Sequence, residues 1–329
     1  MSPRPAAQPG AFRRVSACLG VGRLVILLVG LPVAVVVAAC GPAVTASPTG
    51  SSPGASSSTA ARPTRIPILI DVQDAVGPSR FLFSFADAQN NSIAAQDMSA
   101  KVDFFDISKS ATAPVATADG RFIWAIEGTK GLYAADVTFT VAGPWAADFT
   151  TTKAGLTETT RVMFDVQEKS STPPIGAKAP VTRTPTLADV GGNVKALSTD
   201  PKPDPAFYML SEDDAIKGHI PFVLVFATPA FCTSRQCGPT LDQVKAIAHE
   251  TQKVSFINVE PYKLQYANDR LQPVLDANGQ LQATDVTNAW GLQTEPWIFV
   301  VDKEGIVRAS FAVVASPDEL NAAINAVAN

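Results

Sequence analysis

Two cysteines, Cys232 and Cys237, are the most reactive side chains of this chain, and four residues separate them. They follow an apolar run, residues 221–226, and precede an amphipathic stretch, residues 241–250. These patterns predict a buried strand and then a helix, which places both thiols on a strand-to-helix turn. Amide groups at a helix N-terminus stabilise a thiolate, the nucleophilic form of cysteine. The spacing therefore points to dithiol chemistry, or to a disulfide in the position where a reactive dithiol would lie.

The pair is expected to lie ahead of the helix. Within a continuous helix, residues five positions apart are separated by about 7.5 Å along the axis and lie on different faces. A disulfide does not easily span that separation, and Pro239 suits a first helical turn. We therefore expect residues 232–237 to form a loop. Cys232 is the favoured attacking sulfur with Cys237 resolving, although the opposite assignment, with Cys237 as nucleophile, stays open.

The N-terminus has the features of an export signal. Arg13, Arg14 and Arg23 precede an apolar core, residues 24–39, whose length is typical of a secretory signal peptide and short for a membrane-spanning helix. The core ends in small residues followed by Cys40, which resembles the lipobox of bacterial lipoproteins. The resemblance implies that residues 1–39 are a signal peptide and that Cys40 is lipidated, anchoring the protein outside the cytoplasm on the bacterial cell membrane. The alternative is an uncleaved anchor helix.

Composition separates a tether from the folded part and excludes one class of partner. Residues 40–65 are rich in Ala, Ser, Thr, Pro and Gly, a composition that predicts a flexible spacer. The formal net charge is −4 and no basic patch indicates a nucleic-acid partner. An extracytoplasmic location would allow disulfides to persist, so we expect exported protein thiols or disulfides as partners. The sequence leaves the oligomeric state open.

Short strands separated by turn signals predict an all-β domain over residues 66–168. Alternating apolar and polar residues favour half-buried strands, and seven of them predict an immunoglobulin-like β-sandwich. The expected strands are residues 66–72, 80–85, 101–105, 121–126, 132–141, 145–150 and 160–166, with turns at 87–92, 117–120 and 128–131.

Residues 131–139 and 143–145 resemble the small Ig-like domains of the YtkA and FixH type, with Tyr133 in the place of a tyrosine corner. This domain has no Cys or His and is expected to be a spacer or docking module.

A proline-rich linker, residues 169–185, leads to a second domain over residues 186–329 in which strands and helices alternate. Apolar strands are expected at 222–226, 254–259, 297–301 and 306–311, and Ser316 begins a capping box for the last helix. This order resembles the α/β thioredoxin fold.

The resemblance is to the thioredoxin-like superfamily that includes TlpA, ResA and AhpC/TSA proteins. It depends on Cys232 after the first core strand, on Cys237-Gly238-Pro239, and on the segment 290–300. It implies that Pro296 is a cis-proline opposite the thiols, that Thr294 and Glu295 adjoin the substrate, and that the protein is a thiol–disulfide oxidoreductase without a metal or cofactor. The family motif has two residues between its cysteines, and Thr240 stands where its second cysteine would follow Gly-Pro.

Three alternatives remain. A peroxiredoxin-like peroxidase is the first, but Pro229 replaces its threonine, and Arg308 is a weak candidate for its arginine. A permanent structural Cys232–Cys237 disulfide in a binding module is the second. A Cu(I)-handling assembly factor is the third, because thiolates suit Cu(I), although neither His219 nor His249 is placed to join the thiols.

Overall fold

The computed structural model describes residues 63–70 and 74–328. All of the described residues belong to one compact unit. The predicted signal peptide (residues 1–39), the lipidation site Cys40 and most of the predicted tether (residues 40–65) lie outside the described residues. No helix in the described ranges is long and apolar enough to cross a membrane.

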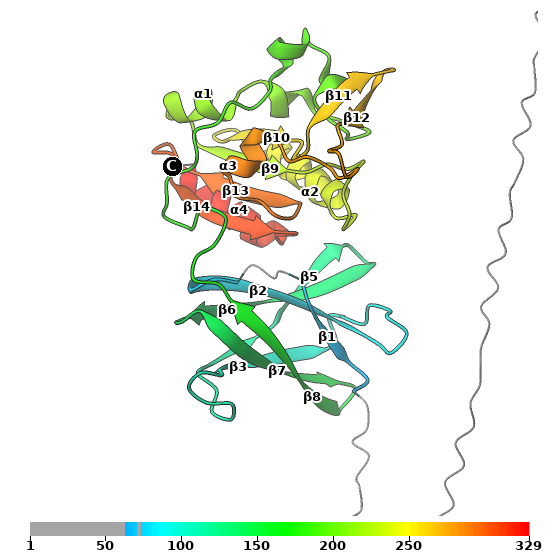
Figure 1. Ribbon diagram of the computed structural model, residues 1–329, viewed down its shortest axis with the longest axis vertical. Coiled ribbons are helices and arrows are strands. Elements are labelled where there is room, and N and C mark those ends of the chain that lie inside the picture. Colours follow the sequence, from blue (N-terminus) through cyan, green and yellow to red (C-terminus); the bar gives the residue numbers. More distant parts are fainter. Residues whose placement is uncertain (1–62, 71–73, 329) are drawn as a thin grey trace, which may run out of the picture. The chain divides into compact units, whose positions relative to one another are not determined.

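The N-terminal part of this unit, hereafter the sandwich region, contains two four-stranded antiparallel sheets (Figure 1). The first has the order β1 (Ile66–Leu69), β2 (Gly77–Ala86), β6 (Lys130–Phe139), β5 (Arg121–Ile126). The second has the order β4 (Ala116–Asp119), β3 (Ser99–Asp106), β7 (Gly143–Lys153), β8 (Leu156–Val166). The arrangement is consistent with the predicted β-sandwich.

Aromatic side chains from both sheets fill the space between them. Phe81 of β2, for example, meets the rings of Phe104 and Phe149 from the opposite sheet. Because successive residues of a strand face opposite ways, Leu82 points away from this core. It belongs instead to a second apolar cluster that includes Val314, far along the chain. Strand β2 is therefore buried on both faces from Phe81 to Ala86, where five of the six residues are apolar.

Two expectations for this region were wrong. Residues 117–120 were expected to be a turn, but β4 occupies most of them, pairs with β3, and the chain turns at Gly120. Small and polar residues in a short edge strand resemble a turn in sequence. Tyr133 was expected to form a tyrosine corner, which bonds to backbone a few residues upstream. Its hydroxyl instead donates to the carbonyl of Ala95, 38 positions upstream, at 2.8 Å.

The C-terminal part, hereafter the α/β region, is built on a mixed four-stranded sheet. The order is β10 (Ser255–Val259), β9 (Phe222–Phe226), β13 (Trp297–Val301), β14 (Val307–Ala312). Strand β10 runs parallel to β9, and β13 runs antiparallel to both β9 and β14. The predicted strands and the Ser316 capping box are confirmed.

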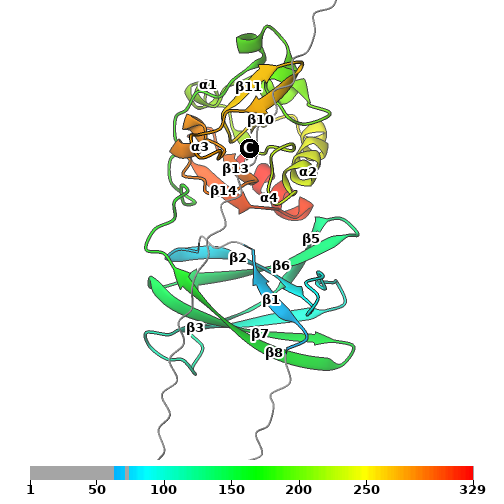
Figure 2. The ribbon, with the colours of Figure 1, turned by 45° about the vertical axis from the view of Figure 1, so that its right-hand side comes forward.

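Helices cover both faces of this sheet (Figure 2). Val223 and Val225 of β9 pack in one cluster with α2 (Cys237–Glu250) and α4 (Pro317–Val327). Phe222, Leu224 and Phe226 belong to a second cluster, together with α1 (Glu212–Lys217) and α3 (Asp285–Ala289). The period-2 alternation of a strand explains why every residue of β9 is buried.

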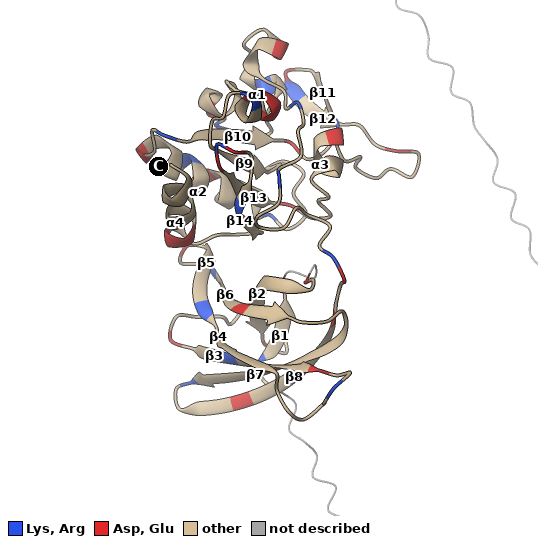
Figure 3. Ribbon diagram, turned by 90° about the vertical axis from the view of Figure 1, so that its left-hand side faces the viewer, with Lys and Arg blue, Asp and Glu red and all other residues tan. Residues whose placement is uncertain are grey.

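Shorter elements complete the α/β region. Three 3-10 turns precede α1, at Leu187–Val190, Val194–Ala196 and Pro205–Tyr208. The long connection after β10 contains a hairpin of β11 (Leu264–Ala267) and β12 (Arg270–Pro273) before α3. Figure 3 shows acidic and basic residues interspersed over both regions, with acidic residues in the first turn of α4.

Candidate dithiol site

Cys232 lies where the sequence predicted, in the loop between β9 and α2, but Cys237 was expected in the same loop and lies instead at the start of the helix. Cys237 is the first residue of α2 and is fully buried, whereas Cys232 lies in the preceding loop and is partly exposed. Both are free thiols in the structure. The loop keeps Cys232 outside the helix, which allows its sulfur to approach the helix N-terminus.

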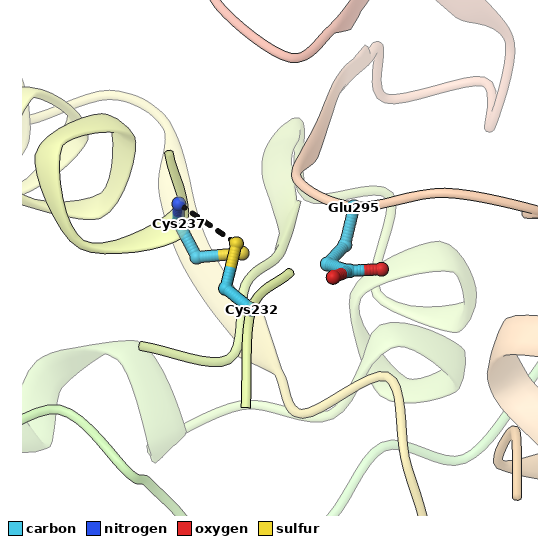
Figure 4. Close-up of side chains that lie close together, drawn as sticks. All are labelled: Cys232, Cys237 and Glu295. Atoms are coloured by element: carbon cyan, nitrogen blue, oxygen red, sulfur yellow. Dashed lines mark hydrogen bonds between the residues drawn. The ribbon is translucent and has the colours of Figure 1, made fainter. Parts of the chain in front are cut away.

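The sulfur of Cys232 accepts hydrogen bonds from the helix end. The backbone N–H of Cys237 points at it, with the nitrogen 3.3 Å from Sγ (Figure 4). The Ser234 hydroxyl lies 3.2 Å from the same sulfur. Hydrogen bonding by the Cys237 thiol, with smaller contributions from Ser234 and the Cys237 amide, lowers the pKa of Cys232 to about 6, against the effects of burial and of Glu295. Cys232 is thus set up as the thiolate of the pair.

Cys237 is shifted in the opposite direction. Its pKa is raised, first because its thiol donates to Cys232 and second because it is buried. A backbone hydrogen bond from Thr228 acts the other way. In the reduced pair, Cys237 therefore holds the proton and Cys232 carries the charge.

Glu295 faces the two sulfurs from the segment that leads into β13 (Figure 4). The residue is 7% exposed, and a carboxylate oxygen lies within 4.8 Å of both sulfurs. One carboxylate oxygen accepts from the backbone N–H of Thr233 at 3.2 Å, and the other accepts from the Tyr262 hydroxyl at 2.6 Å. Burial and this hydrogen bond raise the pKa of Tyr262. The structure thus brings together Cys232, Cys237 and Glu295.

Thr294 and Pro296, which the sequence placed near the thiols, also lie at this site. The Glu295–Pro296 peptide bond is cis, which confirms the prediction for Pro296. Thr294 is exposed, and its hydroxyl accepts from the indole N–H of Trp297 at 3.3 Å. Thr294 and Glu295 both line a cavity that extends to Thr233 and Ser234.

The side chains of Cys232, Cys237 and Glu295 could also hold a metal ion. Two thiolates and one carboxylate, mutually within 4.8 Å, match the preferences of thiophilic ions such as Zn²⁺ or Cu(I). No histidine belongs to this group. His219 is exposed with Nδ1 3.0 Å from the carbonyl of Lys303, and His249 lies 3.5 Å from Asp204, so both have the surface positions expected for them.

Arg308 does not take part in the site. Its guanidinium pairs with Asp302 at 2.5 Å, in the turn between β13 and β14. The role that a peroxidase would need from it therefore has no support in the geometry.

Sequence reasoning missed several residues around the dithiol. Gln236, 3% exposed, donates to the backbone carbonyl of Ala125 at 2.5 Å. The cavity beside Glu295 also includes Lys130 and Leu132 from the sandwich region. Nothing local in the sequence connects residues more than 100 positions apart, so only the structure could assign them. Tyr262 was only weakly indicated as a site residue by the sequence, as an aromatic residue early in the long connection after β10.

No family model matches the chain, and no curated protein or solved structure matches it either. The chemistry of the site is therefore inferred from its own residues.

Proposed function

We propose that this protein is a thiol–disulfide exchange protein that acts through Cys232 and Cys237. The observation that carries the proposal is the pairing of a partly exposed sulfur, which receives the first N–H of α2, with a fully buried thiol beside it. This asymmetry supplies an attacking group and a resolving group, the two parts that exchange requires. The proposal includes the location predicted from the sequence, a lipid anchor on Cys40 outside the cytoplasm.

The proposal also includes a thioredoxin fold for the α/β region and an immunoglobulin-like fold for the sandwich region. Support for the first comes from the strand order β10-β9-β13-β14 with helices on both faces, and from a dithiol between the central strand β9 and α2. Support for the second comes from two antiparallel sheets around a shared core.

In the first step, the Cys232 thiolate attacks a substrate disulfide. A bond forms between Cys232 Sγ and one substrate sulfur, and the other substrate sulfur leaves as a thiolate with the bonding pair. The lowered pKa of Cys232 keeps most of this sulfur ionised at neutral pH.

In the second step, Cys237 resolves the mixed disulfide. The largest cause of its raised pKa is its hydrogen bond to the Cys232 sulfur, and that sulfur loses its charge once it is bonded to substrate. The pKa of Cys237 then falls toward the value set by burial and by the Thr228 backbone. Cys237 loses its proton to solvent, attacks Cys232 Sγ and releases the second substrate thiolate, so two substrate thiols replace one substrate disulfide.

The decisive measurement is the reduction potential of the full-length protein, by titration against glutathione with thiols counted by mass spectrometry. A value between about −120 and −270 mV is expected, the range of catalytic dithiols. Cys237→Ser should accumulate a mixed disulfide on Cys232, and Cys232→Ser should not. A potential below about −300 mV would instead identify a structural disulfide.

A second candidate function is favoured by the cluster of Cys232, Cys237 and Glu295, whose ligand atoms lie within 4.8 Å of one another. This set could bind Cu(I) or Zn²⁺ in transfer to another protein. Anaerobic competition with a chromophoric chelator tests it. Glu295→Gln should weaken Zn²⁺ binding if the carboxylate is a ligand, and unchanged chelator competition on adding reduced protein would reject this function.

A further inference from the structure

The sandwich region contacts the dithiol loop directly. The side-chain amide of Gln236, the residue before Cys237, donates to the carbonyl of Ala125 on β5 in a buried contact. Val314, which follows β14, is 1% exposed and packs in one cluster with Leu82 and Leu132 of the sandwich region. Residues of both regions therefore meet beside the dithiol loop, and both regions belong to the same compact unit.

A cavity of about 380 Å³ lies at this contact. Its lining includes Ser234, whose hydroxyl lies 3.2 Å from the sulfur of Cys232. Its α/β wall includes Ser234, Tyr262 and Glu295, and its other wall includes Lys130 and Leu132. The volume lies near the lower end of the range for small-molecule sites, about 300–1,000 Å³. A space of this size, walled on two sides, suits a small disulfide better than a loop of a folded protein.

The charges of the lining indicate the chemistry of the ligand. Glu295 is buried and already bonded to Thr233 and Tyr262. Lys130 is the cationic residue of the lining, it is exposed, and no ion pair engages it within the described part of the chain. A carboxylate on the ligand would give this ammonium group its partner.

We propose that the cavity binds a low-molecular-weight disulfide that bears a carboxylate, with Lys130 as the residue that recognises the carboxylate. This inference rests on the proposed function and names its substrate class. One ligand disulfide oxidises the Cys232–Cys237 dithiol to its intramolecular disulfide and leaves as two thiols, as in the two steps above. The sandwich region thereby restricts which disulfides reach Cys232.

The test measures single-turnover oxidation of the reduced full-length protein by three probes of different charge and size. These are 3,3′-dithiodipropionate (two carboxylates), bis(2-hydroxyethyl) disulfide (neutral) and insulin (a protein disulfide), each rate divided by that of free dithiothreitol with the same probe. We expect the dicarboxylate to be preferred over the neutral probe by about threefold, because an exposed ion pair contributes only modestly to binding. Lys130→Gln should remove that preference, so that the dicarboxylate and the neutral probe react at similar rates.

Two further variants sharpen the result. Lys253→Gln is the matched control, because Lys253 is also exposed and does not line the cavity, and it should keep the preference. Lys130→Glu should reverse the preference in favour of the cationic disulfide cystamine. A preference that survives Lys130→Gln, or insulin reacting faster than both small probes, would overturn the inference while leaving exchange intact. Failure of all probes, the neutral one included, would overturn the proposed function itself.

Discussion

The sandwich region and the α/β region bury different kinds of group. Between the sheets of the sandwich region lies an aromatic and aliphatic core, and its buried Asp106 pairs with Lys109 at 3.0 Å. The α/β region buries Glu212, Glu260 and Glu295, and no ion pair engages any of them within residues 63–70 and 74–328. Burying an unpaired carboxyl group costs stability.

This difference indicates that the two regions have separate roles. The sandwich region contributes packing and one wall of the cavity, whereas the α/β region retains three buried acids, of which Glu295 lies beside the reactive thiols. Burial raises the pKa of Glu212 to about 8 and that of Glu260 to about 7, so at neutral pH Glu212 is mostly protonated and Glu260 is partly protonated. Perturbed groups of this kind are concentrated at functional sites.

The largest effect should come from removing aromatic packing in the sandwich region. Phe81→Ala, at a fully buried position, should cost about 3–5 kcal/mol of unfolding free energy, from lost transfer energy and the cavity left behind. Urea denaturation followed by circular dichroism measures it. Leu156→Ala, at a side chain that is 71% exposed, is the control and should change stability by less than about 0.5 kcal/mol.

The same variant tests how far the two regions depend on each other. Alkylation of Cys237, which is fully buried, reports unfolding of the α/β region separately. If the contact at Gln236 and Val314 couples the regions, Cys237 should become reactive at the lower urea concentration in Phe81→Ala. Protection of Cys237 at its original midpoint would show that the regions unfold independently.

The next largest effect is a dependence of the unfolding free energy on pH, caused by Glu212. Its folded pKa of about 8 lies above the ordinary value of 4.5, so its contribution to stability is complete below pH 4.5 and is lost as pH rises through 8. The slope is at most about 1.4 kcal/mol per pH unit, or roughly 2 kcal/mol between pH 6 and pH 8. Glu212→Gln, which resembles the protonated acid, should flatten the curve by that amount.

Thermal or urea unfolding at several pH values between 5 and 9 measures this slope. Glu250→Gln, at an exposed position late in α2, serves as the control and should keep the wild-type slope. Glu260 titrates at a lower pH and remains in both variants, so the difference between them isolates Glu212. Equal slopes in Glu212→Gln and wild type would show that Glu212 does not titrate with unfolding.

The elements of the fold that depend on local sequence patterns could be predicted, whereas the contacts between distant segments could not. The strands of both regions follow from local alternation and apolar runs, and the position of Cys232 before α2 follows from Pro239 and the apolar strand ahead of it. The partners of Tyr133 and Gln236 could not be predicted, because their hydrogen bonds join segments 38 and 111 positions apart. Burial of Glu212 likewise depends on Trp290 and Thr182, which are distant in sequence.

A smaller effect is expected at the ion pair between the regions. Burial alone would raise the pKa of Glu319, but Arg80, with Arg121 and the Ser316 amide, lowers it to about 2. This lowered pKa contributes stability above the ordinary value of 4.5, which is lost as pH falls toward 2. Glu319→Gln should cost about 1–2 kcal/mol at pH 7 and progressively less below pH 4.5.

Unfolding at pH 7 and pH 3 provides this comparison. Asp136→Asn is the matched control, because Asp136 pairs with Arg121 in solvent and should contribute less than about 1 kcal/mol. A cost for Glu319→Gln that is the same at both pH values would mean that lost capping of α4, rather than charge, accounts for it.

The smallest effect is expected at Glu295, the buried acid closest to the two cysteines. The charge of Glu295 opposes ionisation of Cys232, so Glu295→Gln should lower the pKa of Cys232, by less than about one unit relative to the same protein with Glu295. The pH dependence of iodoacetamide alkylation in Cys237→Ser and in Cys237→Ser/Glu295→Gln measures the shift. Glu304→Gln, in the exposed turn after β13, should leave that pKa unchanged. A higher pKa in Glu295→Gln would mean that the carboxylate supports the thiolate by holding Thr233 in place, and that this buried acid organises the loop more than it repels the sulfur.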